Sequence, residues 1–265
     1  MDRITAGLSL LALAFFNSGR VVAVNPERSK CIEYSVIVEK TFNHDVRAYT
    51  QGLFFYGGDF YESLGQWGES AFRKVKLETG DVLSEINFPP NVFIEGSCVV
   101  GGYLYILTWT NHKCYMYDLA TMTKLSEFSY PGEGWGLTTN GRELIMSDGS
   151  SRLRFLNPAS FSSIRTVDVK MNGADVRYLN ELEYINGKIW ANVYLQDYLV
   201  IINPDTGEVE GKVDCRNLLP KSLRTSRTDV LNGIAYDPKD GGIYLTGKYW
   251  PKLYKITLKE GGIKK

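Results

Sequence analysis

Short apolar or alternating runs, separated by turn dipeptides, fill the chain from residue 34 to residue 258. Residues 34–39 alternate apolar and polar side chains, as a strand with one buried face does. Dipeptides such as Asn140-Gly141 supply the positive φ angles that tight hairpins need. No long segment has a convincing 3.6-residue apolar period, and the polar stretch 217–228 is expected to be a short helix or a loop. The pattern predicts an all-β fold.

Five segments of the chain repeat one another. Each opens on a polar or aromatic residue and continues through a turn, a second strand rich in β-forming residues and a third strand, and in four of them glycine follows the opening residue. The openings are about 40 to 52 residues apart, close to the period of a four-stranded propeller blade, roughly 40–50 residues. The opening residues are Gln51, Glu95, Trp135, Asn180 and Asn232.

A fourth strand follows each of the first four units but not the fifth. The predicted fourth strands are residues 81–86, 124–128, 163–169 and 208–213. The strand at residues 34–41 can supply the missing one, so we predict a five-bladed β-propeller whose ring is closed by the N-terminal strand joining the last blade. Closure removes the open sheet edges that invite aggregation. A β-sandwich of similar strand count is the competing architecture, and the fivefold recurrence argues against it.

The N-terminus has the organisation of a secretory signal. Arg3 is followed by an apolar run from Ala6 to Phe16, which is too short to span a bilayer, and then by Val21-Val22-Ala23, a small-residue cleavage site. We expect a signal peptide over 1–23, a linker over 24–33 and a single propeller catalytic domain over 34–265. The product should be exported, either periplasmic or secreted, with no membrane contact in the mature form. A membrane anchor is the alternative interpretation of the apolar run.

Composition and charge narrow the class of protein further. The chain is 44% hydrophobic and 23% charged, which suits a globular domain with a sizeable core. Its 17 tyrosines favour strands over helices. With 30 basic and 30 acidic residues and no basic stripe, the sequence indicates no nucleic-acid partner.

Four cysteines are present, and their spacing matches no zinc motif. Export would permit disulfides. Cys31 and Cys215 are the expected pair, because both fall outside the inner segments, and Cys98 is expected to be a small buried hydrophobe. The full pairing, including Cys114, stays open.

In a propeller the five openings would meet at one end of a central channel. Glu95 would then be the one carboxylate among amides and aromatic rings, with Lys248 as a nearby ammonium group. Burial disfavours the charged form of a carboxyl group, which suits Glu95 to acid/base work near neutral pH. The alternative is that Glu95 only accepts backbone hydrogen bonds. The sequence has no Ser/His/Asp set and no metal-ligand cluster of histidine and carboxylate.

Other conspicuous residues are assigned structural roles. Glu181 and Glu183 share a strand face, and salt bridges are their expected role in preference to a carboxylate pair. Trp67, Trp190 and Trp250 are expected to pack within or between blades.

An ordered series of motifs spans roughly residues 34 to 258. They are His44-Asp45, Tyr49-Thr50-Gln51-Gly52-Leu53, Glu62-Ser63 with Gly65, Ile94-Glu95-Gly96, Gly134-Trp135-Gly136-Leu137, Ser147-Asp148-Gly149, Leu179-Asn180-Glu181-Leu182-Glu183-Tyr184, Val230-Leu231-Asn232-Gly233-Ile234-Ala235 and Thr246-Gly247-Lys248 with Trp250-Pro251. This series resembles the plant and bacterial type of glutaminyl-peptide cyclotransferase, a family that folds as a five-bladed propeller.

The resemblance implies conversion of the N-terminal glutamine of peptides or proteins to pyroglutamate, with release of ammonia. It implies Glu95 as the acid/base residue, with polar substrate contacts and an aromatic pocket wall. The implied polar contacts are Gln51, Asn180 and Lys248, and the implied wall residues are Tyr49, Phe93, Trp109, Trp135 and Tyr194. Tyr49 stands where phenylalanine is usual in the family and Tyr194 where tryptophan is usual, which bears on substrate affinity more than on activity.

The resemblance also implies that catalysis needs no zinc or other cofactor, and we expect a monomer that binds no metal for chemistry. A structural calcium in the channel stays an open alternative. Two other functions compete with the cyclotransferase: a non-catalytic propeller that binds peptides or glycans, and a lactonase-like hydrolase. The hydrolase ranks last, because its channel metal needs several carboxylate and amide ligands.

Overall fold

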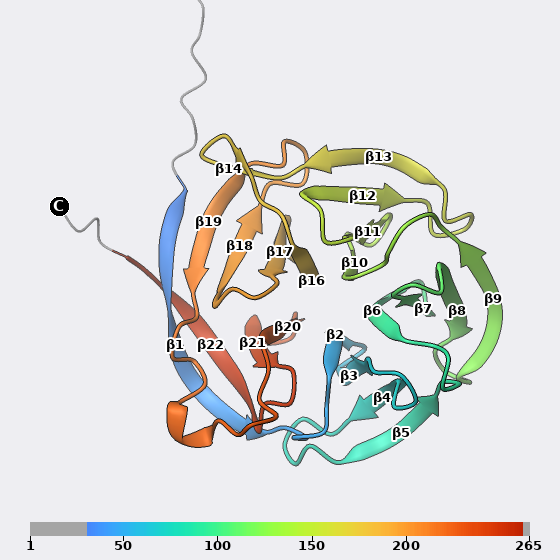
Figure 1. The fold of residues 1–265 in the computed structure, drawn as a ribbon, viewed down its shortest axis with the longest axis horizontal. Coiled ribbons are helices and arrows are strands. Elements are labelled where there is room, and N and C mark those ends of the chain that lie inside the picture. Colours follow the sequence, from blue (N-terminus) through green and yellow to red (C-terminus); the bar gives the residue numbers. More distant parts are fainter. Residues whose placement is uncertain (1–30, 262–265) are drawn as a thin grey trace, which may run out of the picture.

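The computed structural model of the protein describes residues 31–261. The predicted signal peptide 1–23 and most of the predicted linker 24–33 lie outside this range. Within it the chain is built of β-strands, with no α-helix. One 3-10 turn, Lys221–Leu223, lies in the stretch 217–228 that was expected to be a short helix or a loop. The sheets are arranged around a common centre in a propeller-like ring (Figure 1).

Three four-stranded antiparallel sheets form one side of this ring. The first contains β2 (Thr50–Tyr56), β3 (Asp59–Leu64), β4 (Ala71–Val75) and β5 (Val82–Asn87). The second contains β6 (Ile94–Val100), β7 (Tyr103–Thr108), β8 (Lys113–Asp118) and β9 (Thr123–Ser129). The third contains β10 (Leu137–Thr139), β11 (Leu144–Met146), β12 (Arg152–Leu156) and β13 (Ser163–Asp168). A small hairpin of β14 (Lys170–Met171) and β15 (Ala174–Asp175) follows, with its turn at Asn172-Gly173.

The rest of the chain forms one eight-stranded sheet, in the order β16-β17-β18-β19-β1-β22-β21-β20. Its strands are β1 (Ile32–Asn43), β16 (Leu179–Ile185), β17 (Lys188–Val193), β18 (Tyr198–Ile202), β19 (Val209–Asp214), β20 (Leu231–Asp237), β21 (Gly242–Gly247) and β22 (Lys252–Glu260). β1 pairs antiparallel with β22, as predicted, and its first residues also pair parallel with β19. It begins at Ile32, so the predicted start at Tyr34 is two residues late.

Burial decreases from the centre of the ring to its rim. The inner strands β2, β6, β16 and β20 are almost wholly buried, whereas β5 and β9 at the rim are almost wholly exposed. The apolar core lies between neighbouring sheets, in five clusters. In one of them Phe54 and Phe72 of the first sheet pack with Ile94 and Leu104 of the second. Each sheet is therefore held by the side chains of its neighbours.

Glycine after an opening residue allows the inner strands to approach closely. A Cβ atom on Gly96 would overlap the backbone at Gly136 and Leu137, and one on Gly136 would overlap the carbonyl of Asn180. The backbone itself uses this closeness, since the amide of Gly96 donates to the carbonyl of Trp135 at 2.7 Å. The repeated glycine of the sequence thus has a packing cause.

The cysteine prediction is wrong in part. All four cysteines are free thiols, and Cys98, Cys114 and Cys215 are buried. The parallel register pairs Ile32 with Gly211, which offsets Cys31 from Cys215 by about 16 Å along the strands. A disulfide needs Cα atoms about 4.4–6.8 Å apart. Cys98 is a small buried hydrophobe, as expected.

Because β1 joins β22 to β19, its removal should destabilise the whole ring. A chain that starts at residue 42 would leave both strand edges unpaired. We expect its melting temperature to fall by on the order of 10 °C or more. A chain that starts at residue 31 keeps β1 and is the matched control. Equal melting temperatures for the two truncated proteins would contradict this role for β1.

Candidate functional site

The predicted site residues gather at one end of the ring. Antiparallel pairing brings the starts of the inner strands beside the ends of the second strands in each sheet. Three aromatic residues lie at the starts of inner strands: Tyr49 precedes β2, Phe93 precedes β6 and Trp135 lies two residues before β10. Three other residues directly follow second strands: Trp109 follows β7, Tyr194 follows β17 and Lys248 follows β21. Gln51, Glu95 and Asn180 lie within the first residues of inner strands. One surface of the ring thus collects every predicted residue.

A β-bulge lies at the opening residue of four of the five inner strands. Register shifts fall between Thr50 and Gly52, Ile94 and Ser97, Leu179 and Leu182, and Leu231 and Ile234. A bulge inserts an extra residue into a strand and changes the direction of its side chain. The shift in β6 contains Glu95.

Glu95 is held by a chain of side-chain amides across the centre. Its Oε1 accepts a hydrogen bond of 2.9 Å from Nε2 of Gln51. Oε1 of Gln51 in turn accepts one of 3.3 Å from Nδ2 of Asn232, which also donates to the carbonyl of Thr50 at 2.8 Å. Asn232 therefore fixes the orientation of Gln51, and Gln51 presents a donor to the carboxyl group.

The ionisation of Glu95 and Lys248 is strongly perturbed. The Glu95 side chain is buried, at 5% residue exposure, and burial raises its pKa well above the usual value, opposed by Lys248 and assisted by Glu133. Burial lowers the pKa of Lys248, while Glu95 and Asp229 oppose that shift. At neutral pH, burial therefore makes the charged form of each group less favourable, relative to its neutral form, than it is in water.

Aromatic rings form the wall of the site. Lys248 Nζ lies 4.4 Å from the ring centroid of Tyr49 and 5.4 Å from that of Tyr194. Cation–π contact favours a positive charge there. Tyr49 and Trp109 each pack against Phe93, with centroids 6.2 and 5.5 Å apart. Trp135 packs edge-on against Tyr194 at 5.7 Å, which joins the predicted wall residues into one surface.

Sequence reasoning missed two members of this wall. Trp67 was expected to pack within or between blades, but the residue is 46% exposed and its ring lies against Phe93, with centroids 5.5 Å apart. Glu133 accepts hydrogen bonds from the indole nitrogens of Trp109 and Trp135. Glu133 could have been found, because it precedes the opening residue Trp135 by two positions and an extended chain places such residues on one side. Trp190 and Trp250 are core residues, as predicted.

The expected salt bridges of Glu181 and Glu183 are wrong. Within residues 31–261 neither carboxylate forms an ion pair. Glu181 instead accepts the backbone amides of Leu53 and Ile234, at 3.2 and 2.9 Å. Glu183 accepts the amide of Tyr236 at 3.1 Å, and burial raises its pKa to about 8. Both carboxyl groups tie inner strands together.

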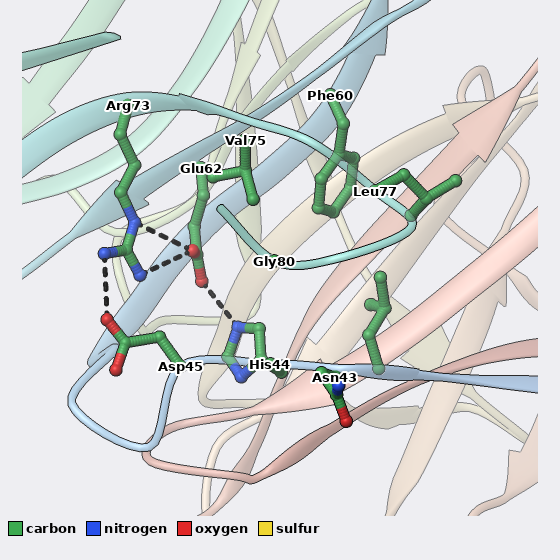
Figure 2. Close-up of a pocket in the computed structure, with 10 residues that line it drawn as sticks. Asn43, His44, Asp45, Phe60, Glu62, Arg73, Val75, Leu77 and Gly80 are labelled. Atoms are coloured by element: carbon green, nitrogen blue, oxygen red, sulfur yellow. Dashed lines mark hydrogen bonds and ion pairs between the residues drawn. The ribbon is translucent and has the colours of Figure 1, made fainter. Parts of the chain in front are cut away.

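A buried ionic network joins His44, Glu62, Arg73 and Asp45 (Figure 2). His44 Nε2 lies 2.9 Å from Oε1 of Glu62, and His44 Nδ1 lies 2.7 Å from the carbonyl of Trp250. Arg73 donates to Oε2 of Glu62 at 3.1 Å and to Asp45 at 3.1 Å. Protonated His44 donates from both ring nitrogens, one to the Trp250 carbonyl and one to the carboxylate of Glu62. These two hydrogen bonds attach the segment after β1 to the loop after β21, which carries Lys248.

No three His, Cys, Asp or Glu side chains within residues 31–261 are grouped so that they could hold one metal ion. The same part of the chain has no helix with the length and apolar character needed to cross a membrane.

The fold and the site together define a class: a propeller-like all-β protein with a buried carboxyl group beside a wall of aromatic side chains. The family model for glutamine cyclotransferase matches residues 8–258. A glutaminyl-peptide cyclotransferase of Arabidopsis thaliana is 40% identical over 236 residues, which cover 88% of this chain and 73% of the relative. The crystal structure of Myxococcus xanthus glutaminyl cyclase matches with a TM-score of 0.82 and 33% identity, over 88% of this chain and 100% of that one. The chain therefore belongs to the glutamine cyclotransferase family.

The ionic network predicts a pH-dependent stability. Burial lowers the pKa of His44, but Glu62 outweighs it and raises the pKa overall. A raised pKa means that the stabilisation is complete below the unfolded-state pKa, about 6.5, and is lost as pH rises through the folded-state pKa. We expect His44→Gln to lose about 3–5 kcal/mol of unfolding free energy near pH 5.5 and less at alkaline pH.

Denaturant unfolding from about pH 5 to pH 9 measures this difference. His112→Gln changes the other histidine of the chain, which is exposed, and is the matched control. A loss of equal size at every pH would show that His44 stabilises by packing alone.

Proposed function

We propose that this protein is a glutaminyl-peptide cyclotransferase that converts the N-terminal glutamine of peptides or proteins to pyroglutamate and releases ammonia. Glu95 is its general acid/base. The observation that carries the proposal is the buried carboxyl group of Glu95, bonded to Gln51 and faced by Lys248 inside the aromatic wall. The similarity to the glutaminyl-peptide cyclotransferase of Arabidopsis and the glutaminyl cyclase of Myxococcus supports it.

We also propose that the ring has five blades. The sheet order supports this count if the eight-stranded sheet is divided at the parallel junction between β19 and β1. Four strands then belong to β16–β19 and four to β20–β22 with β1. The five apolar clusters, one between each pair of neighbouring blades, support the same count.

The reaction needs one proton to move between two nitrogen atoms. The substrate's neutral α-amine attacks the carbon of its own γ-carboxamide, and Glu95 takes a proton from that nitrogen as the ring closes. The same proton then passes to the carboxamide nitrogen, and ammonia leaves as the C–N bond breaks. Gln51 occupies Oε1 of Glu95, which leaves Oε2 for this transfer. A pKa raised toward neutrality lets one group accept and return the proton.

Binding and charge supply the remaining acceleration. Cyclisation is intramolecular, so the aromatic wall contributes by holding the glutamine side chain in a curled conformation. The developing oxyanion needs a donor, and Lys248 is suited to this because its ammonium group lies in the wall at 3% exposure. One well-placed donor is worth about 3–4 kcal/mol. Asn180, also buried, is proposed as a further polar contact with the substrate.

We propose that these groups are sufficient without a metal or other cofactor, and that the protein acts as a monomer. Ammonia release from a dipeptide with N-terminal glutamine, measured with purified protein in a chelator, tests the activity and the cofactor proposal together. The aromatic wall contains tyrosine at positions 49 and 194, and their hydroxyl groups are proposed to affect substrate affinity more than turnover.

The acid/base role predicts a specific effect of Glu95→Gln. Glutamine keeps the shape and the hydrogen bond of the side chain but cannot accept and return a proton. We expect normal folding, retained substrate binding and a loss of about 10²–10⁴ in kcat. Lys248→Ala is the companion variant, with a loss equivalent to about 3–4 kcal/mol. In wild-type protein the activity should rise with pH through the raised pKa of Glu95, because the base must be ionised.

Melting temperature and kcat should be measured on one preparation of each variant. Full activity in a correctly folded Glu95→Gln protein would refute the acid/base role. Lower stability with full residual activity would assign Glu95 a structural role instead.

Export gives a separate prediction. We propose that the chain is a periplasmic or secreted protein, cleaved near Ala23 after the apolar run from Ala6 to Phe16. N-terminal sequencing of protein recovered outside the cytoplasm should begin within a few residues of position 24. A mature chain that still begins at Met1 would overturn the cleavage.

A further inference from the structure

We propose that Glu133 recognises the N-terminal ammonium group of the substrate and thereby restricts the reaction to glutamine at the end of a chain. The proposal rests on the function proposed above and names a specificity residue for it. Glu133 lies between β9 and β10, in the segment that leads to Trp135.

The carboxylate of Glu133 is fixed by two indoles from neighbouring sheets. Its Oε2 accepts the Nε1–H of Trp109 at 2.7 Å and the Nε1–H of Trp135 at 2.8 Å. Trp109 follows β7 and Trp135 precedes β10, so one oxygen atom joins two sheets at the pocket wall. Two donors on one oxygen stabilise the negative charge and hold it in a defined place.

The second carboxylate oxygen has no protein partner. Within residues 31–261 Oε1 of Glu133 accepts no hydrogen bond, and its carboxylate forms no ion pair. Arg154 approaches only the backbone carbonyl of Glu133, at 3.4 Å, and pairs with Asp148. A partly buried carboxylate without a cation is uncommon, because charges removed from water are normally paired. A cationic ligand would complete the site.

Glu133 also acts on the catalytic carboxyl group. Its charge raises the pKa of Glu95, so the two carboxylates are close enough to interact. The other ionisable groups that interact with Glu95 are Lys248 and the phenols of Tyr49 and Tyr130. Only Lys248 among them is a cation, and it lies against Tyr49 and Tyr194 rather than against the two indoles.

The chemistry of the substrate supplies the matching charge. A peptide α-amine has a pKa of about 7.7–8.0 and is mostly an ammonium group at neutral pH. Internal glutamine has no such charge. The carboxylate of Glu133 would capture the ammonium form, and loss of one proton to solvent then gives the neutral amine that attacks. Lys248 and Glu133 would orient the two ends of the glutamine residue, the carbonyl oxygen toward the first and the amine toward the second.

Glu133→Gln tests the charge with little change of shape. One amide oxygen can accept both indole donors, as Oε2 does now, so the variant removes the charge and keeps the wall. With Gln-Ala amide as substrate, KM should rise about 10- to 100-fold at about pH 6.5, the range of a hydrogen bond to a charged group. The increase should shrink above the pKa of the substrate amine. Glu85→Gln, on the exposed rim strand β5, is the matched control.

A second measurement does not depend on turnover. Met-Ala amide has the ammonium group but no γ-carboxamide, and its N-acetyl derivative has neither. Both compounds are tested as competitive inhibitors. Wild-type protein should be inhibited about tenfold or more strongly by the compound with the free amine, and Glu133→Gln should lose that preference. Equal inhibition of the wild type by both compounds, or a KM effect that is the same at all pH values, would overturn the proposal. Absence of wild-type ammonia release would instead refute the proposed function.

Discussion

The close approach of the inner strands at the centre of the ring is the constraint on which the site depends. Gly96 and Gly136 lie so near the next inner strand that neither position can hold a side chain. Polar groups at the strand starts are therefore removed from bulk water and must bond to one another. The sequence of donors from Asn232 to Gln51 to Glu95 is the result. Buried polar groups cost free energy unless they are hydrogen-bonded, so these hydrogen bonds stabilise the centre of the ring and also orient Glu95, the proposed acid/base residue.

The same constraint explains the one repeat that lacks the glycine. At the fourth opening Glu181 occupies the position that glycine takes elsewhere, and its carboxylate reaches the backbone amides of Leu53 and Ile234 on two other inner strands. A long acceptor side chain thus joins strands that elsewhere touch directly. Glu183, two residues further, repeats this contact with Tyr236. The pair replaces direct backbone contact with carboxylate bridges, which is why salt-bridge partners are not needed.

Most of the fold follows from local pattern, and most of the site does not. Strand limits agree with the turn dipeptides to within about two residues, because glycine and alternation act locally. Glu95 and Lys248 were identifiable because Glu95 is the one carboxylate among the five opening residues and Lys248 directly follows a second strand. The bulges that aim the opening residues, such as that at Ile94–Ser97, have no signal in alternation, since a bulge breaks it.

Two other sequence predictions, the Cys31–Cys215 disulfide and the packing role of Trp67, were wrong for physical reasons. Cys31 and Cys215 looked pairable because both lie outside the inner strands, but only the parallel register of β1 on β19 reveals their separation. Trp67 follows a strand end and looked like ordinary packing, yet its loop turns toward Phe93. In each case the decisive quantity is a distance between segments that are far apart in sequence, which composition and period cannot give.

Burial raises the pKa of three glutamates near the centre, Glu95, Glu181 and Glu183, so a raised pKa alone does not select one of them for acid/base work. Burial and Glu183 raise the pKa of Glu181, while the two backbone amides that it accepts oppose the shift. Each oxygen of Glu181 thus already accepts a backbone amide from another inner strand. Glu95 is bonded at one oxygen only, by a side-chain amide, and faces Lys248 and the aromatic wall. General acid/base catalysis needs a carboxyl oxygen that the substrate can reach, and this difference between the two groups is why Glu95 is the residue proposed for that role.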